Sequence, residues 1–182
     1  MWSCSGSSQS RRKELKFTLK STRVMTLRIG QRVPVFSLLD YDKKERRLSE
    51  FTEKGKVVLA FFPFAFSGVC DKEMCTFRDS LTKLNSMNAQ VVGVSVDSLY
   101  ALKVFAKTYE LQFPLLSDFN KKVSKVYDVL HDTWVSYGYR GVSKRAVFLI
   151  DAKGILRYKW VTEVPSNEPP YDEMLSTLNK LS

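Results

Sequence analysis

The sequence has little of what metal centres, disulfide scaffolds and membrane anchors are built from. Its 182 residues include a single histidine, His131, and three cysteines, an odd number. Cys70 and Cys75 lack the spacing of zinc ligands, and they do not form the paired pattern of a secreted disulfide framework. No stretch approaches the ~20 consecutive apolar residues that a membrane helix needs. We therefore expect a soluble protein with no metal site and no membrane contact.

The surplus of positive charge does not indicate a nucleic-acid-binding surface. The formal net charge is +10, and half of it lies in residues 1–24, where six basic side chains accompany a single acid, Glu14. The rest of the chain holds 23 basic and 18 acidic side chains, which are spread rather than clustered. Binding to a phosphate backbone relies on concentrated basic patches. We therefore expect no nucleic acid among the main partners.

Residues 1–26 are predicted to be a disordered basic tail, and residues 27–182 a single domain. The tail is rich in serine and basic residues and has no apolar periodicity that would bury a face. It faintly resembles a mitochondrial presequence, against which Glu14 and weak amphipathicity argue, and a true start at Met25 is an equal alternative. We expect a cytoplasmic location, with organelle targeting by the tail as the weaker alternative.

Strand and helix patterns alternate along the rest of the chain. Apolar, β-branched runs predict buried strands at 57–62 and 91–97, and apolar residues at three- and four-residue steps predict a helix over about 70–88. Ser98 is expected to cap a helix that runs through Tyr109. The remaining predictions are a short strand at 35–39, a short helix around 123–127, a loop over 131–144, a hairpin of strands 145–151 and 155–161, and a final helix at 171–181. This order predicts an α/β fold in which helices flank both faces of a central mixed β-sheet.

Cys70 lies where a reactive cysteine would be built. It falls in or just before the first turn of the predicted helix, shortly after the strand at 57–62. Unpaired backbone N–H groups and the positive end of the helix dipole favour a thiolate at that position. A free thiol with a pKa of about 8.5 is only ~3% ionised at pH 7, so a lowered pKa greatly increases reactivity. The alternative is that Cys70 and Cys75 are inert thiols packed as small hydrophobic side chains.

The pattern Pro63-x-x-x-Ser67-x-x-Cys70-x-x-Glu73, with Arg145 opening Arg-Ala-Val-Phe-Leu-Ile-Asp far downstream, resembles that of a peroxiredoxin. The run around Cys70 is similar to the one-cysteine-type alkyl hydroperoxide reductase E branch. It also resembles the bacterioferritin-comigratory branch, whose second cysteine often lies five residues on. The resemblance covers nearly everything but the tail.

This resemblance implies a thioredoxin-like fold and a thiol-specific peroxidase of antioxidant defence. Such an enzyme reduces hydrogen peroxide and organic hydroperoxides without a bound cofactor. The resemblance also implies a thiol reductant, such as a thioredoxin- or glutaredoxin-like protein, and a homodimer or higher homo-oligomer.

The resemblance further assigns roles to individual side chains. Cys70 would be the peroxidatic cysteine, which attacks a peroxide oxygen and becomes sulfenic acid. Ser67 would hydrogen-bond the thiolate and the peroxide, and Arg145 would stabilise the thiolate and the developing charge. Pro63 would shape and shield the floor of the pocket. Threonine is commoner at the position of Ser67, and serine keeps the hydroxyl.

The residues themselves support these roles and leave alternatives open. Cleavage of an O–O bond by a thiolate needs an ionised sulfur, a donor to the leaving oxygen and near-attack positioning. Arginine is always charged and so can lower a cysteine pKa. The alternatives are that Arg145 is a surface ion-pair residue and that Ser67 only caps the helix. Glu73, a supporting residue, could pair with Arg78 or another arginine, or be solvated.

Cys75 is predicted as the resolving cysteine, although an intact helix would keep it from Cys70. Five helical residues separate two Cα atoms by about 8.6 Å, whereas a disulfide tolerates at most about 7 Å. Either the first helical turn unwinds after oxidation, or Cys75 is a spectator and an external thiol resolves Cys70. Two other classes of protein remain as alternatives: a thioredoxin-fold holdase with a structural Cys70, and a thiol–disulfide oxidoreductase, which the absence of Cys-x-x-Cys disfavours.

Overall fold

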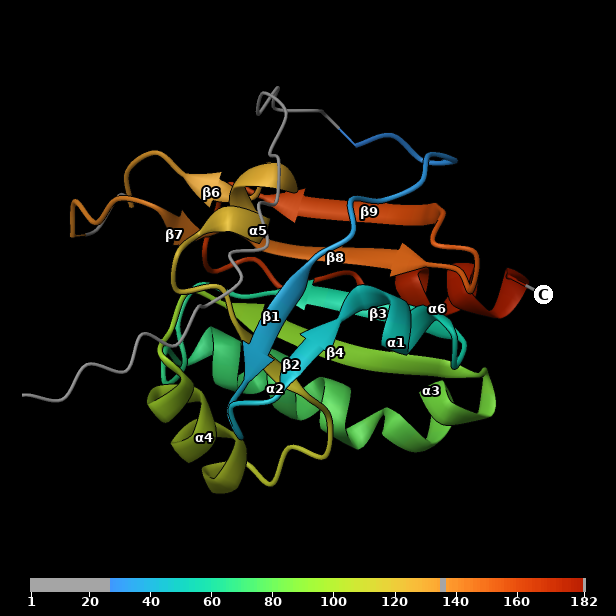
Figure 1. Cartoon of the computed structure of the whole chain (residues 1–182), viewed down its shortest axis with the longest axis horizontal. Coiled ribbons are helices and arrows are strands. Elements are labelled where there is room, and N and C mark those ends of the chain that lie inside the picture. Colours follow the sequence, from blue (N-terminus) through green and yellow to red (C-terminus); the bar gives the residue numbers. More distant parts are fainter. Residues whose placement is uncertain (1–26, 135–136, 182) are drawn as a thin grey trace, which may run out of the picture.

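The computed structural model describes residues 27–134 and 137–181, which fold around a seven-stranded mixed sheet (Figure 1). The strands of this sheet are β1 (Ser37–Asp40), β2 (Glu45–Arg47), β3 (Lys56–Phe61), β4 (Ala89–Ser95), β5 (Leu115–Ser117), β8 (Arg145–Ile150) and β9 (Leu156–Thr162). Their spatial order is β2-β1-β5-β4-β3-β8-β9. Strand β3 pairs in parallel with β4 and antiparallel with β8, so it lies inside the sheet with neighbours on both sides.

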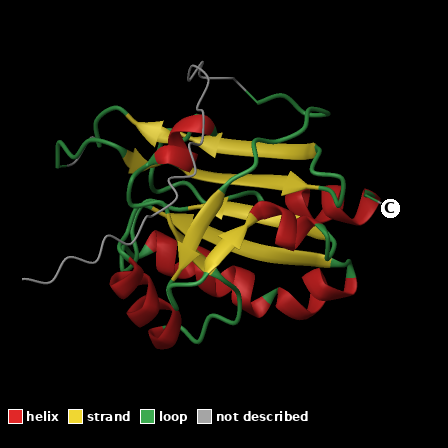
Figure 2. Ribbon diagram, in the orientation of Figure 1, coloured by secondary structure: helices red, strands yellow, loops and turns green. Residues whose placement is uncertain are grey.

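Helices cover both faces of the sheet (Figure 2). They are α1 (Leu48–Thr52), α2 (Val69–Asp79), α3 (Leu81–Ser86), α4 (Leu99–Thr108), α5 (Lys122–Val126) and α6 (Tyr171–Lys180). Helices α2, α3, α4 and α6 pack into one core cluster with Val58 and Ala60 of β3. Helices α1 and α5 pack into a second cluster with Val57 and Leu59. Side chains of a strand alternate between its faces, so β3 feeds both cores. The predicted α/β fold is confirmed.

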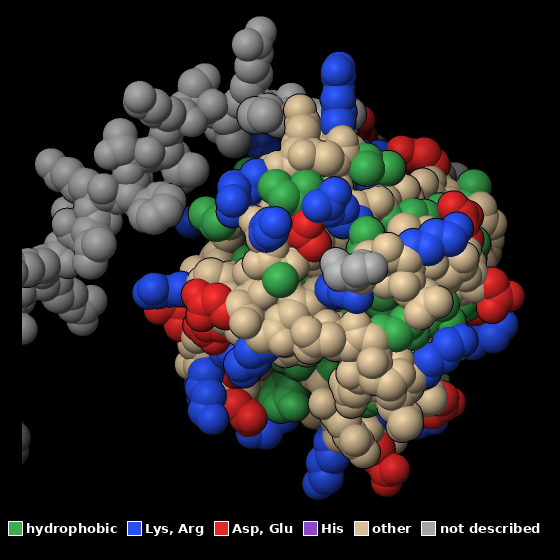
Figure 3. All heavy atoms as spheres, turned by 90° about the vertical axis from the view of Figure 1, so that its right-hand side faces the viewer, with side chains coloured by type: hydrophobic (Ala, Val, Ile, Leu, Met, Phe, Trp, Pro, Cys, Tyr) green, Lys and Arg blue, Asp and Glu red, His purple; other side chains and the backbone are tan. Residues whose placement is uncertain are grey.

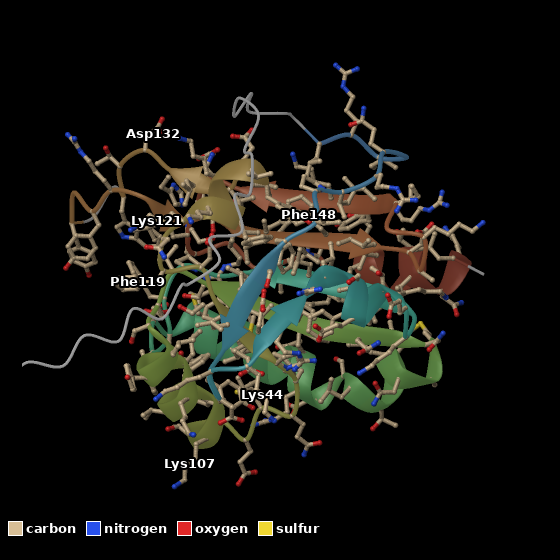
Figure 4. The ribbon with its side chains drawn as sticks, in the orientation of Figure 1. Lys44, Lys107, Phe119, Lys121, Asp132 and Phe148 are labelled. Carbon is tan, nitrogen blue, oxygen red and sulfur yellow. The ribbon has the colours of Figure 1, made fainter. Side chains whose placement is uncertain are left out.

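Local sequence accounts for the main elements. The hydroxyl of Ser98 accepts a hydrogen bond from the backbone N–H of Ala101 at 3.3 Å, which confirms the predicted cap of α4. Gly93 of β4 has no room for a side chain, since a Cβ there would lie 2.5 Å from Cδ2 of Leu115. Most apolar side chains face the core and most charged ones face outward. In Figure 4, Phe148 of β8 lies in the interior, and Lys107 of α4 extends away from the molecule.

The structure corrects three sequence-based expectations. The helix predicted over 70–88 is two helices, α2 and α3, that meet at Ser80, whose N–H bonds to the carbonyls of both Thr76 and Phe77 as at a helix end. The loop predicted over 131–144 contains a two-stranded hairpin of β6 (Leu130–His131) and β7 (Val142–Ser143). Strand β2 and helix α1 were not predicted. They are short and polar on their outer sides, so they show little periodicity.

The predicted tail, residues 1–26, lies outside the described residues. On the face of the described part that Figure 3 shows, basic and acidic side chains are intermingled, with small hydrophobic areas between them. Among the helices of residues 27–134 and 137–181, none combines the length and the apolar character needed to cross a membrane.

Candidate active site

Cys70 is the second residue of α2, at the junction between the central strand β3 and this helix. The connecting loop needs unusual backbone angles, with φ of +61° at Phe66 and +53° at Gly68, just before the helix. The side chain of Cys70 is completely buried. The predicted position of Cys70 in the first helical turn is therefore confirmed.

Arg145 reaches Cys70 through strand pairing. β8 runs antiparallel to β3 with Phe61 opposite Ala146, so the first residue of β8 lies beside the chain where it leaves β3. Nη2 of Arg145 donates a hydrogen bond to Sγ of Cys70 at 3.4 Å and another to the carbonyl of Pro165 at 3.0 Å. Arg145 is 1% exposed, so it is not the surface ion-pair residue of the alternative hypothesis.

Glu73 joins the same cluster from the next turn of α2. Residues three apart share one face of a helix, so Glu73 lies on the side of Cys70 that faces Arg145. Its Oε2 forms a buried ion pair with Nη1 of Arg145. Burial raises the pKa of Glu73 to about 7, against the opposing effect of the Arg145 charge. Of the alternatives for Glu73, pairing with an arginine other than Arg78 is the one observed.

Burial and charge act in opposite directions on Cys70. Burial raises the pKa of the Cys70 thiol, whereas the positive charge of Arg145 and, to a smaller extent, the polar groups of nearby Ser67 and Phe64 lower it. Burial is the largest of these effects, and the net direction is upward. The sequence-based expectation of a lowered pKa is therefore wrong for this buried arrangement. Helix position predicted the favourable effects, but it carried no information on how completely the sulfur is removed from water.

Ser67 and Pro63 lie in the loop that carries the chain from β3 to Cys70. The hydroxyl of Ser67 donates a hydrogen bond to the carbonyl of Phe64 at 2.8 Å, and the carbonyl of Ser67 accepts the N–H of Cys70 at 3.4 Å. The Ser67 side chain is exposed, whereas Pro63 is buried directly after the central strand. Ser67 is thus at the surface three residues before Cys70, and Pro63 is buried seven residues before it.

Cys75 lies apart from this cluster. It is half-buried and belongs to the same continuous helix as Cys70. Helix geometry therefore separates the two Cα atoms by about 8.6 Å, beyond the reach of a disulfide. Both thiols are free in this structure.

Sequence reasoning missed several contacts that hold the site. Oδ2 of Asp97, just beyond β4, accepts the backbone N–H of Ala65 at 2.7 Å, in the loop before Cys70. Asp97 was visible only as a polar residue at the end of a buried strand. The hydroxyl of Tyr109 donates to Oδ2 of Asp71 at 2.9 Å. No sequence pattern indicated that the carbonyl of Pro165 accepts a hydrogen bond from Arg145.

An aromatic group adjoins the loop before Cys70. The ring of Phe64 packs against Trp134 and Tyr139, with centroids 5.8 Å and 6.2 Å apart. Both partners belong to the connection between β6 and β7. Phe64, Trp134 and Tyr139 therefore form an apolar wall close to the site.

The fold and the site together define a class. A mixed sheet with flanking helices, a buried cysteine at the strand–helix junction and an arginine donating to its sulfur are typical of a thioredoxin-like protein with cysteine-based redox chemistry. The comparisons with known proteins agree, because residues 29–159 match the AhpC/TSA family.

Relatives and solved structures extend this match. The chloroplastic 2-cysteine peroxiredoxin of Chattonella marina var. antiqua is 33% identical over 167 residues, which are 86% of this chain and 82% of the relative. The chloroplastic peroxiredoxin Q of Populus jackii is 36% identical over 165 residues, 90% of this chain and 74% of the relative. The crystal structure of peroxidoxin BcpB from Mycobacterium tuberculosis superimposes with a TM-score of 0.76 at 30% identity, and covers 86% of this chain and 99% of that one.

The chain therefore belongs to the AhpC/TSA peroxiredoxin family. It is a thiol-dependent peroxide reductase that works through a cysteine, with a peroxide as substrate and a thiol as reductant. The fold and the family predicted from the motif around Cys70 are both confirmed.

Proposed function

We propose that Cys70 is the peroxidatic cysteine and that Arg145 is its main electrostatic partner. The observation that carries this proposal is the 3.4 Å hydrogen bond from Nη2 of Arg145 to Sγ of Cys70, with both side chains buried. A buried positive charge stabilises the thiolate and the negative charge that builds on the departing peroxide oxygen. Arginine suits this role because its planar group can serve two acceptors at once.

The chemistry needs no group beyond the chain and its two substrates. The Cys70 thiolate attacks one peroxide oxygen of ROOH, the O–O bond breaks, and the departing alkoxide takes up a proton to leave as ROH. Cys70 retains the other oxygen as sulfenic acid. The sulfur has been oxidised by two electrons and the peroxide reduced by two.

The surrounding residues support this step in different ways. Ser67, which is exposed in the loop between β3 and α2, would hydrogen-bond the thiolate and the incoming peroxide. Pro63 would close the floor of the pocket behind Cys70. Glu73 would orient the guanidinium of Arg145 through their buried ion pair. The apolar wall of Phe64, Trp134 and Tyr139 favours organic hydroperoxides as substrates beside hydrogen peroxide.

We further propose that Cys75 resolves the oxidised Cys70 after the first turn of α2 unwinds, with an external thiol as the alternative. This assigns the chain to the bacterioferritin-comigratory branch, which the similarity to peroxiredoxin Q and to peroxidoxin BcpB supports. The reductant is proposed to be a thioredoxin- or glutaredoxin-like protein. A homodimer or higher homo-oligomer is proposed as the assembly, in line with the exposed apolar side chains of Phe66 and Phe119.

For the location, we propose the cytoplasm, with residues 1–26 as a tail outside the domain 27–182. Two relatives are described as chloroplastic, so the tail is the segment to test for targeting. If the tail contains no targeting signal, fluorescent fusions of the full chain and of residues 27–182 should have the same distribution in the cell.

Peroxide consumption with a thiol donor tests the central assignment. Cys70→Ser should abolish turnover, since a serine hydroxyl is protonated at neutral pH and is a far weaker nucleophile. Tyr100→Phe, an exposed position, should keep the wild-type rate and controls for handling. Turnover of Cys70→Ser above a few per cent of wild type would remove Cys70 from the reaction.

A further inference from the structure

Tyr109, the residue that follows α4, contacts the chain on both sides of Cys70. Its ring lies 6.2 Å from the ring of Phe66, four residues before the cysteine, and 5.1 Å from that of Phe105 in its own helix. Its hydroxyl donates a hydrogen bond to Asp71, the residue directly after the cysteine, at 2.9 Å. Helices α2 and α4 lie on the same face of the sheet, which allows this contact (Figure 1).

A fourth contact ties Tyr109 to the far end of α2. Nη1 of Arg78 donates to the backbone carbonyl of Tyr109 at 2.8 Å. This bond fixes the backbone of Tyr109 to the last turn of α2. The position of the Tyr109 hydroxyl relative to Asp71 in the first turn is therefore restricted. The arrangement therefore connects the start of α2 to its stable end through one residue.

We propose that Tyr109 is a positioning residue that keeps the segment 66–71 closed over Cys70 and thereby sets how readily the first turn of α2 opens. The inference rests on the proposed function in one respect, because it takes Cys75 to be the partner that opening delivers. Neither Tyr109 nor Asp71 hydrogen-bonds to Sγ of Cys70 or to Arg145, so the attack on peroxide in the closed form does not depend on this contact.

Opening must break the Tyr109 contact before the two cysteines can meet. Asp71 is bonded to Cys70 through the backbone, so any unwinding that carries Cys70 toward Cys75 also moves Asp71 away from the hydroxyl of Tyr109. Within the described residues, the other polar side-chain contact of residues 69–72 outside the catalytic cluster is the ion pair of Lys72 with Glu168, whose lysine is 68% exposed. An exposed ion pair contributes little. A hydrogen bond to a carboxylate is among the stronger ones.

Closure and opening lead to different products from the same sulfenic acid. In the open form, Cys70–SOH and Cys75–SH condense to a disulfide and release water. In the closed form, a second ROOH transfers an oxygen to Cys70–SOH, which becomes sulfinic acid while ROH leaves. A contact that prolongs closure therefore raises the share of sulfinic acid at high peroxide, and its loss lowers that share.

Tyr109→Phe tests the proposal because it removes the hydroxyl and keeps the ring. Hydrogen exchange should show the amides of residues 70–73 opening roughly 3- to 10-fold more often, the effect expected for the loss of one partly exposed hydrogen bond. Under excess hydrogen peroxide, peptide mass spectrometry should show the fraction of sulfinic Cys70 falling by roughly the same factor. Tyr100→Phe, the same change at an exposed position in α4, should leave both measurements at the wild-type value.

A second variant identifies the bond responsible. Asp71→Ala removes the acceptor, so it should speed exchange to a similar extent, and combining it with Tyr109→Phe should add little further. Additive effects of the two changes, or unchanged exchange in Tyr109→Phe, would overturn the proposal. Faster exchange with an unchanged sulfinic fraction, together with a Cys75→Ser variant that over-oxidises no more than wild type, would leave the role of Tyr109 intact and refute resolution by Cys75.

Discussion

Asp97 accepts the backbone N–H of Ala65 at 2.7 Å, and in this way the end of β4 holds the loop that leads to Cys70. The same carboxylate oxygen accepts the hydroxyl of Ser95 at 2.6 Å. Burial raises the pKa of Asp97, while the bonds from Ser95 and Ala65 lower it. The Asp97 carboxylate is thus an acceptor held in place by Ser95, and it fixes the backbone of the loop at Ala65.

The first prediction concerns this acceptor. Asp97→Ala leaves the N–H of Ala65 and the hydroxyl of Ser95 without their partner, so the free energy of unfolding should fall by about 1–3 kcal/mol. The rate of reaction with peroxide should fall as well, because the loop before Cys70 loses its tether. Urea unfolding and stopped-flow kinetics measure the two effects. Asp97→Asn, which keeps one carbonyl oxygen as an acceptor, should lie between wild type and Asp97→Ala. Wild-type stability and rate in Asp97→Ala would contradict a holding role.

The second prediction concerns the charge next to the sulfur. Arg145→Ala removes the positive charge that lowers the pKa of Cys70, so the pH midpoint of Cys70 alkylation should rise. The second-order rate with peroxide should fall by roughly 10²- to 10³-fold, as for the loss of one preorganised donor. Arg145→Lys, the matched control, keeps the charge and loses the second arm of the guanidinium, so its alkylation midpoint should move less. An alkylation profile identical to that of wild type would remove Arg145 from the site.

The third prediction follows from the pKa of Glu73, which burial raises to about 7. A carboxyl group whose pKa is higher in the folded than in the unfolded protein holds its proton longer when folded. Its stabilising contribution is complete below the unfolded value of about 4.5 and is lost as the pH rises through the folded value. Between these two values, the free energy of unfolding should fall by up to about 1.4 kcal/mol per pH unit more in wild type than in Glu73→Gln.

Denaturant unfolding at several pH values between 4.5 and 8 measures this difference. The pH profile of Cys70 alkylation is a second, independent test of Glu73, because the negative charge of Glu73 raises the pKa of Cys70. Glu73→Gln should therefore shift the alkylation midpoint downward, opposite to Arg145→Ala. Parallel stability curves for wild type and Glu73→Gln would show that Glu73 does not titrate in this range.

The fourth prediction concerns Cys75. If Cys75 resolves Cys70, one equivalent of peroxide should give an intramolecular 70–75 disulfide and a loss of helix by circular dichroism, since the two cannot bond within an intact α2. Cys75→Ser should then stop at sulfenic acid and over-oxidise readily. If Cys75 is only a core thiol, that variant should keep full turnover with an external thiol. Peptide mass spectrometry that finds oxidised Cys70 beside an alkylatable Cys75 would exclude resolution by Cys75.

The proximity of Arg145 to Cys70 was expected from the family resemblance, and the pairing of two strands explains it. The runs at 57–62 and 145–151 are apolar enough to be central strands, and in the sheet they are neighbours. Once they pair, the first residue of β8 and the first turn of α2 must lie close together. The partner of Glu73 was not predictable in the same way, since a charged residue on a helix has several possible partners and periodicity does not choose between them.

Contacts made by the ends of long side chains were beyond the reach of sequence reasoning. Tyr109 and Asp71 are 38 residues apart, and neither belongs to a recognisable motif. The direction of the pKa of Cys70 was also missed, because it depends on complete burial of the sulfur and not on its position in the helix. Local patterns thus predicted the main elements and their order, and tertiary packing decided the protonation of the site and the contacts that hold it.

The connection between β9 and α6 offers a way to engineer reactivity without altering the motif. This segment provides the Pro165 carbonyl that shares Nη2 of Arg145 with Cys70, and Glu168, which pairs with Lys72 beside the cysteine. The family match ends at residue 159, so this segment lies past its end. A library of loop variants over residues 163–168 could therefore redirect the guanidinium toward or away from the sulfur while every motif residue stays in place.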